Sequence, residues 1–291
     1  MATSNLTNDP LGINTEDDDS NPLDALTNLF TSSEEPDPSD PSAMSLVDHL
    51  EELRRRIFKI LISIAVFSVV AFIFRIQIMT FLTWPLPKAA DVLGGKLTVT
   101  GLGEGFTTYL LLSIAGGFVA SLPVVLYQAW AFIGPGLYSH EKKHAVPFIV
   151  VGLFMFLAGL ALGYVVLQYP VAWLVGFASD SFTEMVSASS YFTFVAYFLL
   201  AFGVVFEIPL VLTFLSLIGM ITAETLTKKR AVAHVGMWIA STVITPGADI
   251  YSPIILGVAM SCLFELSIIF IRISTRIRER NEARAAAAEE E

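Results

Sequence analysis

Residues 191–220 read YFTFVAYFLLAFGVVFEIPLVLTFLSLIGM, and Glu207 is the only charged side chain in this run. An α-helix crosses a hydrocarbon core of about 30 Å with about 20 predominantly apolar residues. Inside a membrane the backbone polar groups must be satisfied by the protein itself, and a helix achieves this with its own hydrogen bonds. The run therefore predicts a membrane-spanning helix that carries one acid near its middle.

Five more apolar runs accompany this one along the chain, so we predict an all-α membrane protein with six transmembrane helices. The run that ends at Thr245-Pro246-Gly247 holds about 15 residues, which is short for a crossing and predicts local bilayer thinning or cover by protein. In the third run, Gly159 and Gly163 have the spacing of closely packed helices. The six runs are Ile57–Phe74, Phe106–Ile133, Val146–Val175, Tyr191–Met220, Ala231–Thr245 and Pro253–Ile271.

The composition excludes an ordinary soluble enzyme. The chain of 291 residues is 54% hydrophobic and only 15% charged, whereas soluble domains are typically about 25% charged. The net charge of −10 comes from residues 1–43, which hold ten acids and no Lys or Arg. So polar a segment buries too little surface to offset its ordering entropy, and we predict a disordered acidic tail there. The single Cys262 excludes a disulfide within the chain, and the bases are too few and dispersed for a nucleic-acid surface.

The basic residues predict the orientation of the helices. Fourteen Lys and Arg side chains flank one side of the six runs, and Arg75, Lys88 and Lys96 flank the other. Basic residues gather on the cytoplasmic side, so an even number of crossings places both termini in the cytoplasm. We expect a cytoplasmic amphipathic helix over residues 44–56, the transmembrane domain over 57–272 and a charged cytoplasmic tail over 273–291.

Two acids lie inside the predicted spans, Glu207 in the fourth and Glu265 in the sixth. A charged acid at the centre of a membrane helix costs about 2.5–3.5 kcal/mol, so such a residue is functional, protonated or paired. Pro209 removes a backbone donor beside Glu207 and predicts a kink there. One alternative function is a proton-coupled small-molecule secondary transporter with Glu207 and Glu265 as proton sites. Such transporters often contain inverted repeats, and we find no such symmetry between the two halves.

Residues His140-Glu141-Lys142-Lys143-His144 match the H-E-x-x-H pattern, in which two histidines bind zinc and the acid acts as a base. A membrane zinc protease is therefore a competing hypothesis. Against it, no motif for a third ligand follows, and two lysines lie within the pattern. We favour Glu141 as a first-turn carboxylate of the third helix, and we predict no metal, no cofactor and no catalytic residue.

Several short motifs follow one another in a fixed order along the body of the chain. They are HLEELRRRI at His49–Ile57, LPVVLYQAWAFIGPGLYSHEKK at Leu122–Lys143, AFGVVFEIPL at Ala201–Leu210, KKR at Lys228–Arg230, TPGAD at Thr245–Asp249 and CLFE at Cys262–Glu265. In this order they resemble the TatC family, the multi-span subunit of the twin-arginine (Sec-independent) protein translocase. The resemblance covers about Met44 to Arg272, and it implies a cupped bundle of six helices in which the last two are short.

The resemblance also implies site residues. Glu52 and Glu141 match the cytoplasmic acids that receive the twin-arginine motif of a signal peptide, and Arg54 matches a basic position of the same helix. Glu207 matches the intramembrane acid of the family, and Glu265 belongs to the CLFE motif. The positions implied to shape the bundle or to contact partners are Pro85, Glu104, Phe106, Pro123, Tyr127, Pro209, Thr245 and Asp249.

The implied function is that of signal-peptide receptor and core subunit of a translocase that exports folded proteins with the proton motive force, without enzymatic activity. Two carboxylates suit an arginine pair, because Arg binds a carboxylate with a planar fork of donors. A folded domain of 100 residues has a radius of gyration of about 13 Å, more than six helices can enclose. The resemblance therefore implies an oligomer with TatA- and TatB-type single-span partners in the lipid bilayer of the bacterial cytoplasmic membrane. Its ligands would be the twin-arginine signal peptides of folded cargo, and nucleic acid would not be a partner.

Overall fold

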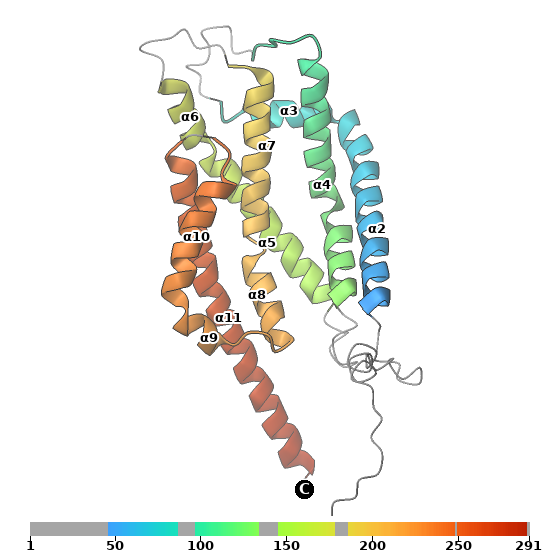
Figure 1. Cartoon of the computed structure of the whole chain (residues 1–291), viewed down its shortest axis with the longest axis vertical. Coiled ribbons are helices and arrows are strands. Elements are labelled where there is room, and N and C mark those ends of the chain that lie inside the picture. The colour runs from blue at the N-terminus through green and yellow to red at the C-terminus, as the bar shows by residue number, and fades with distance from the viewer. Residues whose placement is uncertain (1–45, 87–96, 134–144, 178–185, 248, 290–291) are drawn as a thin grey trace, which may run out of the picture. The chain divides into compact units, whose positions relative to one another are not determined.

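The computed structural model describes residues 46–86, 97–133, 145–177, 186–247 and 249–289 (Figure 1). The predicted acidic tail at residues 1–43 lies outside this part of the chain. Residues Leu53–Glu291 form one compact unit, and residues Met1–Glu52 belong to another. The packing described below concerns the unit that begins at Leu53.

The described residues are almost entirely helical, which confirms the predicted all-α class. Within them, β pairing is limited to an isolated bridge between Thr98 and Ser187. The helices are α2 (Leu46–Ile73), α3 (Arg75–Thr83), α4 (Glu104–Ile133), α5 (Ala145–Val166), α6 (Gln168–Gly176), α7 (Ala188–Val205), α8 (Ile208–Leu217), α9 (Ala223–Lys228), α10 (Arg230–Ile244) and α11 (Tyr251–Glu289).

In the described part of the chain, five helical segments are long and apolar enough to cross a membrane. They are Asp48–Ile73, Glu104–Phe132, Val146–Gly176, Ala188–Leu217 and Tyr251–Arg280. Each overlaps most or all of one of the predicted apolar runs. The remaining run forms the shorter apolar helix α10, which has 15 residues and ends before Thr245-Pro246-Gly247 as the sequence predicts.

The prediction of a short final helix is wrong. Helix α11 has 39 residues, because the charged stretch after Ile271 continues the same helix to Glu289. This stretch is rich in Arg, Glu and Ala, which favour helix even outside an apolar environment. The predicted boundary at residues 272 and 273 is therefore a change in polarity within one helix. Helix α2 likewise runs through the boundary predicted at residues 56 and 57.

Helix α7 lies at the centre of the core. Its side chains Phe192, Val195, Phe198 and Phe202 are buried, and it contacts both α4 and α5. Leu167 between α5 and α6 is buried in the same cluster. Figure 1 shows α7, in yellow, beside α4 and crossed obliquely by α5. A central helix with aromatic residues on several sides is typical of a span that faces other helices rather than lipid.

Glycines allow α5 and α7 to approach each other closely. A Cβ atom added at Gly159 would lie 2.6 Å from the carbonyl oxygen of Phe202, and one added at Gly163 would lie 3.0 Å from the Cβ of Phe202. From the other side, a Cβ atom at Gly203 would lie 2.6 Å from the ring of Phe156. The predicted packing role of Gly159 and Gly163 is confirmed, since small residues let backbones meet in a membrane.

Helix α3 is short and lies near the N-terminal ends of α4 and α7 (Figure 1). Two tyrosines, one from α5 and one from α7, hold its last turn. The hydroxyl of Tyr164 donates to the carbonyl oxygen of Phe81 at 2.8 Å, and that of Tyr191 donates to the carbonyl oxygen of Leu82 at 2.7 Å. These are carbonyls of the last turn, where the usual donor four residues later is missing, and that of Phe81 also accepts from the backbone N–H of Trp84 at 3.4 Å. Pro85 follows and is buried, in keeping with its implied structural role.

The close approach of α5 and α7 predicts a difference between two glycine substitutions. Gly159→Ala should lower the free energy of unfolding by about 1–3 kcal/mol, because the new methyl group overlaps backbone and ring atoms of α7. Gly236→Ala in α10 is the control, since nothing lies within 4 Å of a Cβ atom there and alanine favours helix. Thermal unfolding of both variants in the same detergent measures the difference. Equal unfolding midpoints would contradict the assigned contact.

Candidate functional site

The site residues implied for the N-terminal helix are only partly described. Arg54 is exposed on α2, and its guanidinium lies 5.7 Å from the ring centroid of Phe58, one turn further along. Glu52 lies on the same helix but belongs to the unit that ends at that residue. Glu141 lies outside the described residues, as do His140 and His144 of the H-E-x-x-H pattern. The pairing of Glu52 with Glu141 therefore stays a prediction.

Helix α2 from Leu53 onward is mostly exposed and meets α4 only at separate points. Arg56 donates from Nη1 to Oε1 of the buried Gln128 at 3.3 Å. Further along, a Cβ atom at Gly117 of α4 would lie 2.5 Å from the backbone nitrogen of Ser68 of α2. Gln128 carries no signal in the sequence beyond being a polar residue in an apolar run, and the structure identifies it as a polar contact between these helices.

Two implied positions on α4 face away from the protein interior. Pro123 lies inside the helix and is exposed, and Tyr127, one turn later, is 53% exposed. A proline inside a helix leaves one carbonyl without its usual donor. Both side chains are available to a partner molecule on the outer surface of α4, next to the Arg56–Gln128 contact.

Glu207 lies at the break between α7 and α8, which confirms the predicted kink. The residue precedes α8 with φ −76° and ψ −11°, and Pro209 follows in the first turn of α8. The backbone N–H of Glu207 donates to the carbonyl oxygen of Val204 at 3.1 Å. The proline is buried, so the break lies inside the protein rather than at a surface loop.

The carboxyl group of Glu207 faces α5 across Gly152. A Cβ atom added at Gly152 would lie 3.4 Å from Oε2 of Glu207 and 3.0 Å from methyl groups of both Leu126 and Leu210. Both carboxyl oxygens are buried, and neither has a hydrogen-bond partner among the described residues. A hydrogen bond from Glu207 to a neighbouring helix of the same chain is thus not found in this part of the structure. Nothing in the local sequence pattern indicates Gly152 as the neighbour of Glu207.

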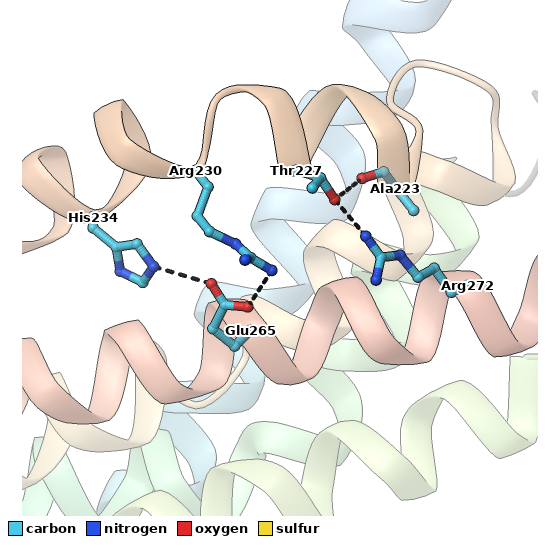
Figure 2. Close-up of polar contacts among 6 residues, drawn as sticks. All are labelled: Ala223, Thr227, Arg230, His234, Glu265 and Arg272. Carbon is cyan, nitrogen blue, oxygen red and sulfur yellow. Dashed lines mark hydrogen bonds and ion pairs between the residues drawn. The ribbon is translucent and has the colours of Figure 1, made fainter.

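Glu265 is paired, in contrast to Glu207 (Figure 2). Its Oε2 accepts from Nη2 of Arg230 at 2.8 Å, and its Oε1 lies 3.1 Å from Nε2 of His234. Arg230 and His234 belong to the first turns of α10, so the cluster fixes that short helix to α11. The transporter hypothesis requires Glu265 as an available proton site, and this pairing disfavours it. The sequence showed both bases, but it could not place them opposite an acid on another helix.

At the opposite end of the unit, Glu104 joins the start of α4 to the start of α7. Its Oε2 accepts from the backbone N–H of Thr100 at 2.5 Å, the hydroxyl of Thr100 at 2.8 Å and the N–H of Gly101 at 3.0 Å. Its Oε1 accepts from the hydroxyl of Ser187 at 2.5 Å and the N–H of Ser189 at 3.0 Å. Glu104 therefore links the segment before α4 to the start of α7 through hydrogen bonds, in keeping with its implied role in shaping the bundle. Phe106, in contrast, is 63% exposed and stays a predicted partner contact.

Thr245 and Asp249 form the turn between α10 and α11. The buried hydroxyl of Thr245 donates to the carbonyl oxygen of Ser241 at 2.9 Å. Asp249 accepts from the backbone N–H of Ser252 at 2.6 Å and from its hydroxyl at 2.6 Å, and so caps the start of α11. Gly247 between them has φ +108°, a conformation that side chains rarely adopt. Buried as they are, these two residues act in the fold rather than at an exposed partner contact.

No group of three His, Cys, Asp or Glu side chains comes together among the described residues. Cys262 is exposed on α11. Within the predicted spans, the described residues include two acids, Glu207 and Glu265. One buried acid is unpaired, and another is held by two bases.

Comparison with known proteins gives one consistent result. A family model described as Sec-independent protein translocase protein (TatC) matches residues 48–258. The Sec-independent protein translocase protein TatC of Desulforapulum autotrophicum is 37% identical over 240 residues, which cover 82% of this chain and 88% of the relative. That of Deinococcus radiodurans is 34% identical over 254 residues, covering 86% of this chain and 94% of the relative.

The same result comes from solved structures. A crystal structure of the twin arginine translocase receptor TatC matches this chain with a TM-score of 0.66 and 30% sequence identity. The match covers 78% of this chain and 99% of that one. The family model itself spans the site residues described above, except Glu265.

The hydrogen bonds of Glu104 predict that an isosteric amide is not tolerated there. In Glu104→Gln the amide nitrogen replaces one accepting oxygen and faces donors from either Thr100 and Gly101 or Ser187 and Ser189. We expect a lower thermal unfolding midpoint, because those donors lose their acceptor. Glu224→Gln is the control, since it removes only an exposed ion pair to Lys228 and should change the midpoint little. If both variants have the same thermal unfolding midpoint as the unchanged protein, the hydrogen bonds of Glu104 do not stabilise this end of the unit.

Proposed function

Because this chain belongs to the TatC family, we propose that it is the signal-peptide receptor and core subunit of a twin-arginine translocase, which exports folded proteins across the bacterial cytoplasmic membrane. The observation that carries the proposal is the match of the family model over residues 48–258. The relatives are named as Sec-independent protein translocase proteins, and the similar crystal structures are those of the receptor TatC.

In this proposal α10 is the fifth of six spans, and both termini lie in the cytoplasm. Helix α10 has 15 residues and is about 22 Å long, which is less than the usual hydrocarbon thickness of about 30 Å. The bilayer thins locally around it, or neighbouring helices cover its ends. The excess of Lys and Arg at one side of the predicted spans supports the orientation. The six spans form the cupped bundle implied by the family.

Signal-peptide recognition would depend on Glu52 and Glu141. Each carboxylate accepts two parallel hydrogen bonds from one guanidinium, a geometry that the ammonium group of lysine cannot reproduce. Hydrogen bonds to charged groups contribute about 1.5–3 kcal/mol each, and loss of one arginine also leaves an acid without its partner. The site thus distinguishes twin arginine from twin lysine without any covalent step.

Glu207 would serve as a polar anchor for a helix that does not belong to this chain. Its two carboxyl oxygens are buried without a partner among the described residues, and one of them lies opposite Gly152 of α5. A polar group on a signal peptide or on a TatA- or TatB-type helix would complete the hydrogen bond. Such bonds between membrane helices contribute about 0.6 kcal/mol on average and up to about 1.7 kcal/mol.

The chain carries no P-loop or related nucleotide motif, so the driving force would come from outside the protein. The proton motive force supplies about 2.3 kcal/mol per charge for each 100 mV. A passage for folded cargo would require several subunits together with single-span partners. In this assembly the chain is a receptor and organiser, not an enzyme.

The receptor proposal predicts the effect of removing the two acids. Glu52→Ala and Glu141→Ala should each weaken binding of a twin-arginine signal peptide at least tenfold, and the double variant should bind twin-arginine and twin-lysine peptides equally. Titration of the purified full chain with labelled peptide measures both affinities.

Glu51→Ala is the matched control, because Glu51 is an exposed acid directly before Glu52. Its peptide affinity should stay within about twofold of that of the unchanged protein. Unchanged binding in the double variant of Glu52 and Glu141 would refute the assignment of these residues.

The anchor proposal for Glu207 predicts that the charge is dispensable while the polarity is not. Glu207→Gln should retain export in a reporter assay, because an amide at this position can still make hydrogen bonds. Glu207→Leu should reduce export, although its apolar side chain should leave the protein folded. Complete loss of export in Glu207→Gln would favour a proton-carrying role instead.

A further inference from the structure

A groove lies between the loop that joins α8 to α9 and the part of α11 that continues beyond its apolar span. Its volume is about 640 Å³. A second hollow of about 650 Å³ lies against α9. The two share Ala223, Glu224, Arg272 and Arg276 in their walls, and together we call them the α9–α11 groove.

The groove has an apolar wall and a basic wall. Leu217, Ile221 and Ile271 line the apolar side, while Arg272 and Arg276 line the basic side. The apolar run of α11 ends at Ile271, and the charged part of the helix begins at the next residue. The groove therefore lies where a membrane span passes from hydrocarbon to the headgroup region.

Arg272 is held in place by a short relay of hydrogen bonds (Figure 2). Its Nη2 donates to the hydroxyl oxygen of Thr227 at 2.8 Å, and that hydroxyl donates to the carbonyl oxygen of Ala223 at 2.6 Å. A guanidinium has five N–H donors, and this contact uses one of them. Arg272 makes no other hydrogen bond or ion pair with a described residue. Its remaining donors are thus positioned but uncommitted.

Arg276 follows one helical turn after Arg272 on the same wall. It is exposed and makes no hydrogen bond or ion pair with any residue in the described part of the chain. Two arginines at this spacing project side by side from a helix. They can therefore bind the same phosphate group from two directions.

The charge of the groove favours an anion. Four bases and two acids line the two hollows, which leaves a net charge of +2. One of the acids, Glu224, is engaged by Lys228 at 2.9 Å. The other, Glu279, lies two turns beyond Arg272 along α11. Arg272 and Arg276 are therefore the groups that determine what binds near the apolar wall.

We propose that the α9–α11 groove binds the phosphodiester headgroup of an anionic phospholipid, with Arg272 and Arg276 as the phosphate ligands. A phosphate accepts charge-assisted, bidentate hydrogen bonds from arginine. Basic pockets at the headgroup level between membrane helices suit anionic lipids. The apolar wall at Leu217 and Ile221 distinguishes a lipid from free phosphate, because it would contact the glycerol and acyl segments. The site goes beyond the receptor function, since it does not involve the signal peptide.

Native mass spectrometry of the purified full chain in detergent tests this proposal. Titration with phosphatidylglycerol and with phosphatidylcholine should show tighter binding of phosphatidylglycerol to the unchanged protein. The double variant R272Q/R276Q should bind phosphatidylglycerol about 30-fold more weakly. The single variant R276Q should lose part of this affinity while the protein stays folded, because Arg276 is exposed and makes no hydrogen bond or ion pair with a described residue. No preference for phosphatidylglycerol in the unchanged protein would overturn the proposal.

The double variant R280Q/R284Q is the matched control, since it removes the same charge at the same spacing from the same helix, beyond the groove. Its affinity for phosphatidylglycerol should stay within about threefold of that of the unchanged protein. An equal loss in both double variants would indicate general attraction to a charged helix and overturn the site. Displacement of bound phosphatidylglycerol by millimolar inorganic phosphate would indicate a free-anion site and overturn the lipid assignment.

Discussion

The close contact of α5 with α7 and α8 is the interaction on which the rest of the compact unit depends. Three glycines of α5 take part in it: Gly163 and Gly159 meet residues of α7, and Gly152 meets the start of α8. Apolar helices gain little by leaving lipid for one another, so association depends on close packing and polar contacts. The glycines supply the first of these. They also leave the space into which the carboxyl group of Glu207 projects.

The acids of the described helices fall into two classes. Glu104 and Glu265 have hydrogen bonds or ion pairs that join two elements, and Asp249 caps the start of α11, so the polarity of these three acids contributes to the fold. Glu207 has none among the described residues, although it is buried in a membrane-spanning segment. A polar group left unsatisfied inside a membrane is costly, which suits a position whose partner arrives with another molecule. A transporter with two proton sites would need both Glu207 and Glu265 to be available, and Glu265 is paired with Arg230 and His234.

The sequence was sufficient for features that depend on local patterns. Apolar length predicts the spans, Thr245-Pro246-Gly247 predicts the end of the short α10, and Pro209 predicts the break before α8. The glycine spacing at Gly159 and Gly163 predicts a helix contact, although not with which helix. The order of the short motifs predicted the TatC family, and the comparisons confirm the family.

What the sequence could not predict are pairings between distant segments. Ser187 lies 83 residues from Glu104, and Arg230 lies 35 residues from Glu265, so no local spacing connects them. Gly152 carries no chemical signal of its own and matters only because Glu207 lies opposite. The length of α11 was missed for another reason. Its charged residues look like a tail, but Ala, Glu and Arg extend a helix that has already formed.

The most direct test of the account is capture of an export substrate by this chain in membranes. A folded substrate with a twin-arginine signal peptide should co-purify with the full chain, and the same substrate with twin lysine should not. Equal recovery of both substrates, or recovery of neither when the chain is folded and inserted, would contradict the claim that this protein is a twin-arginine receptor.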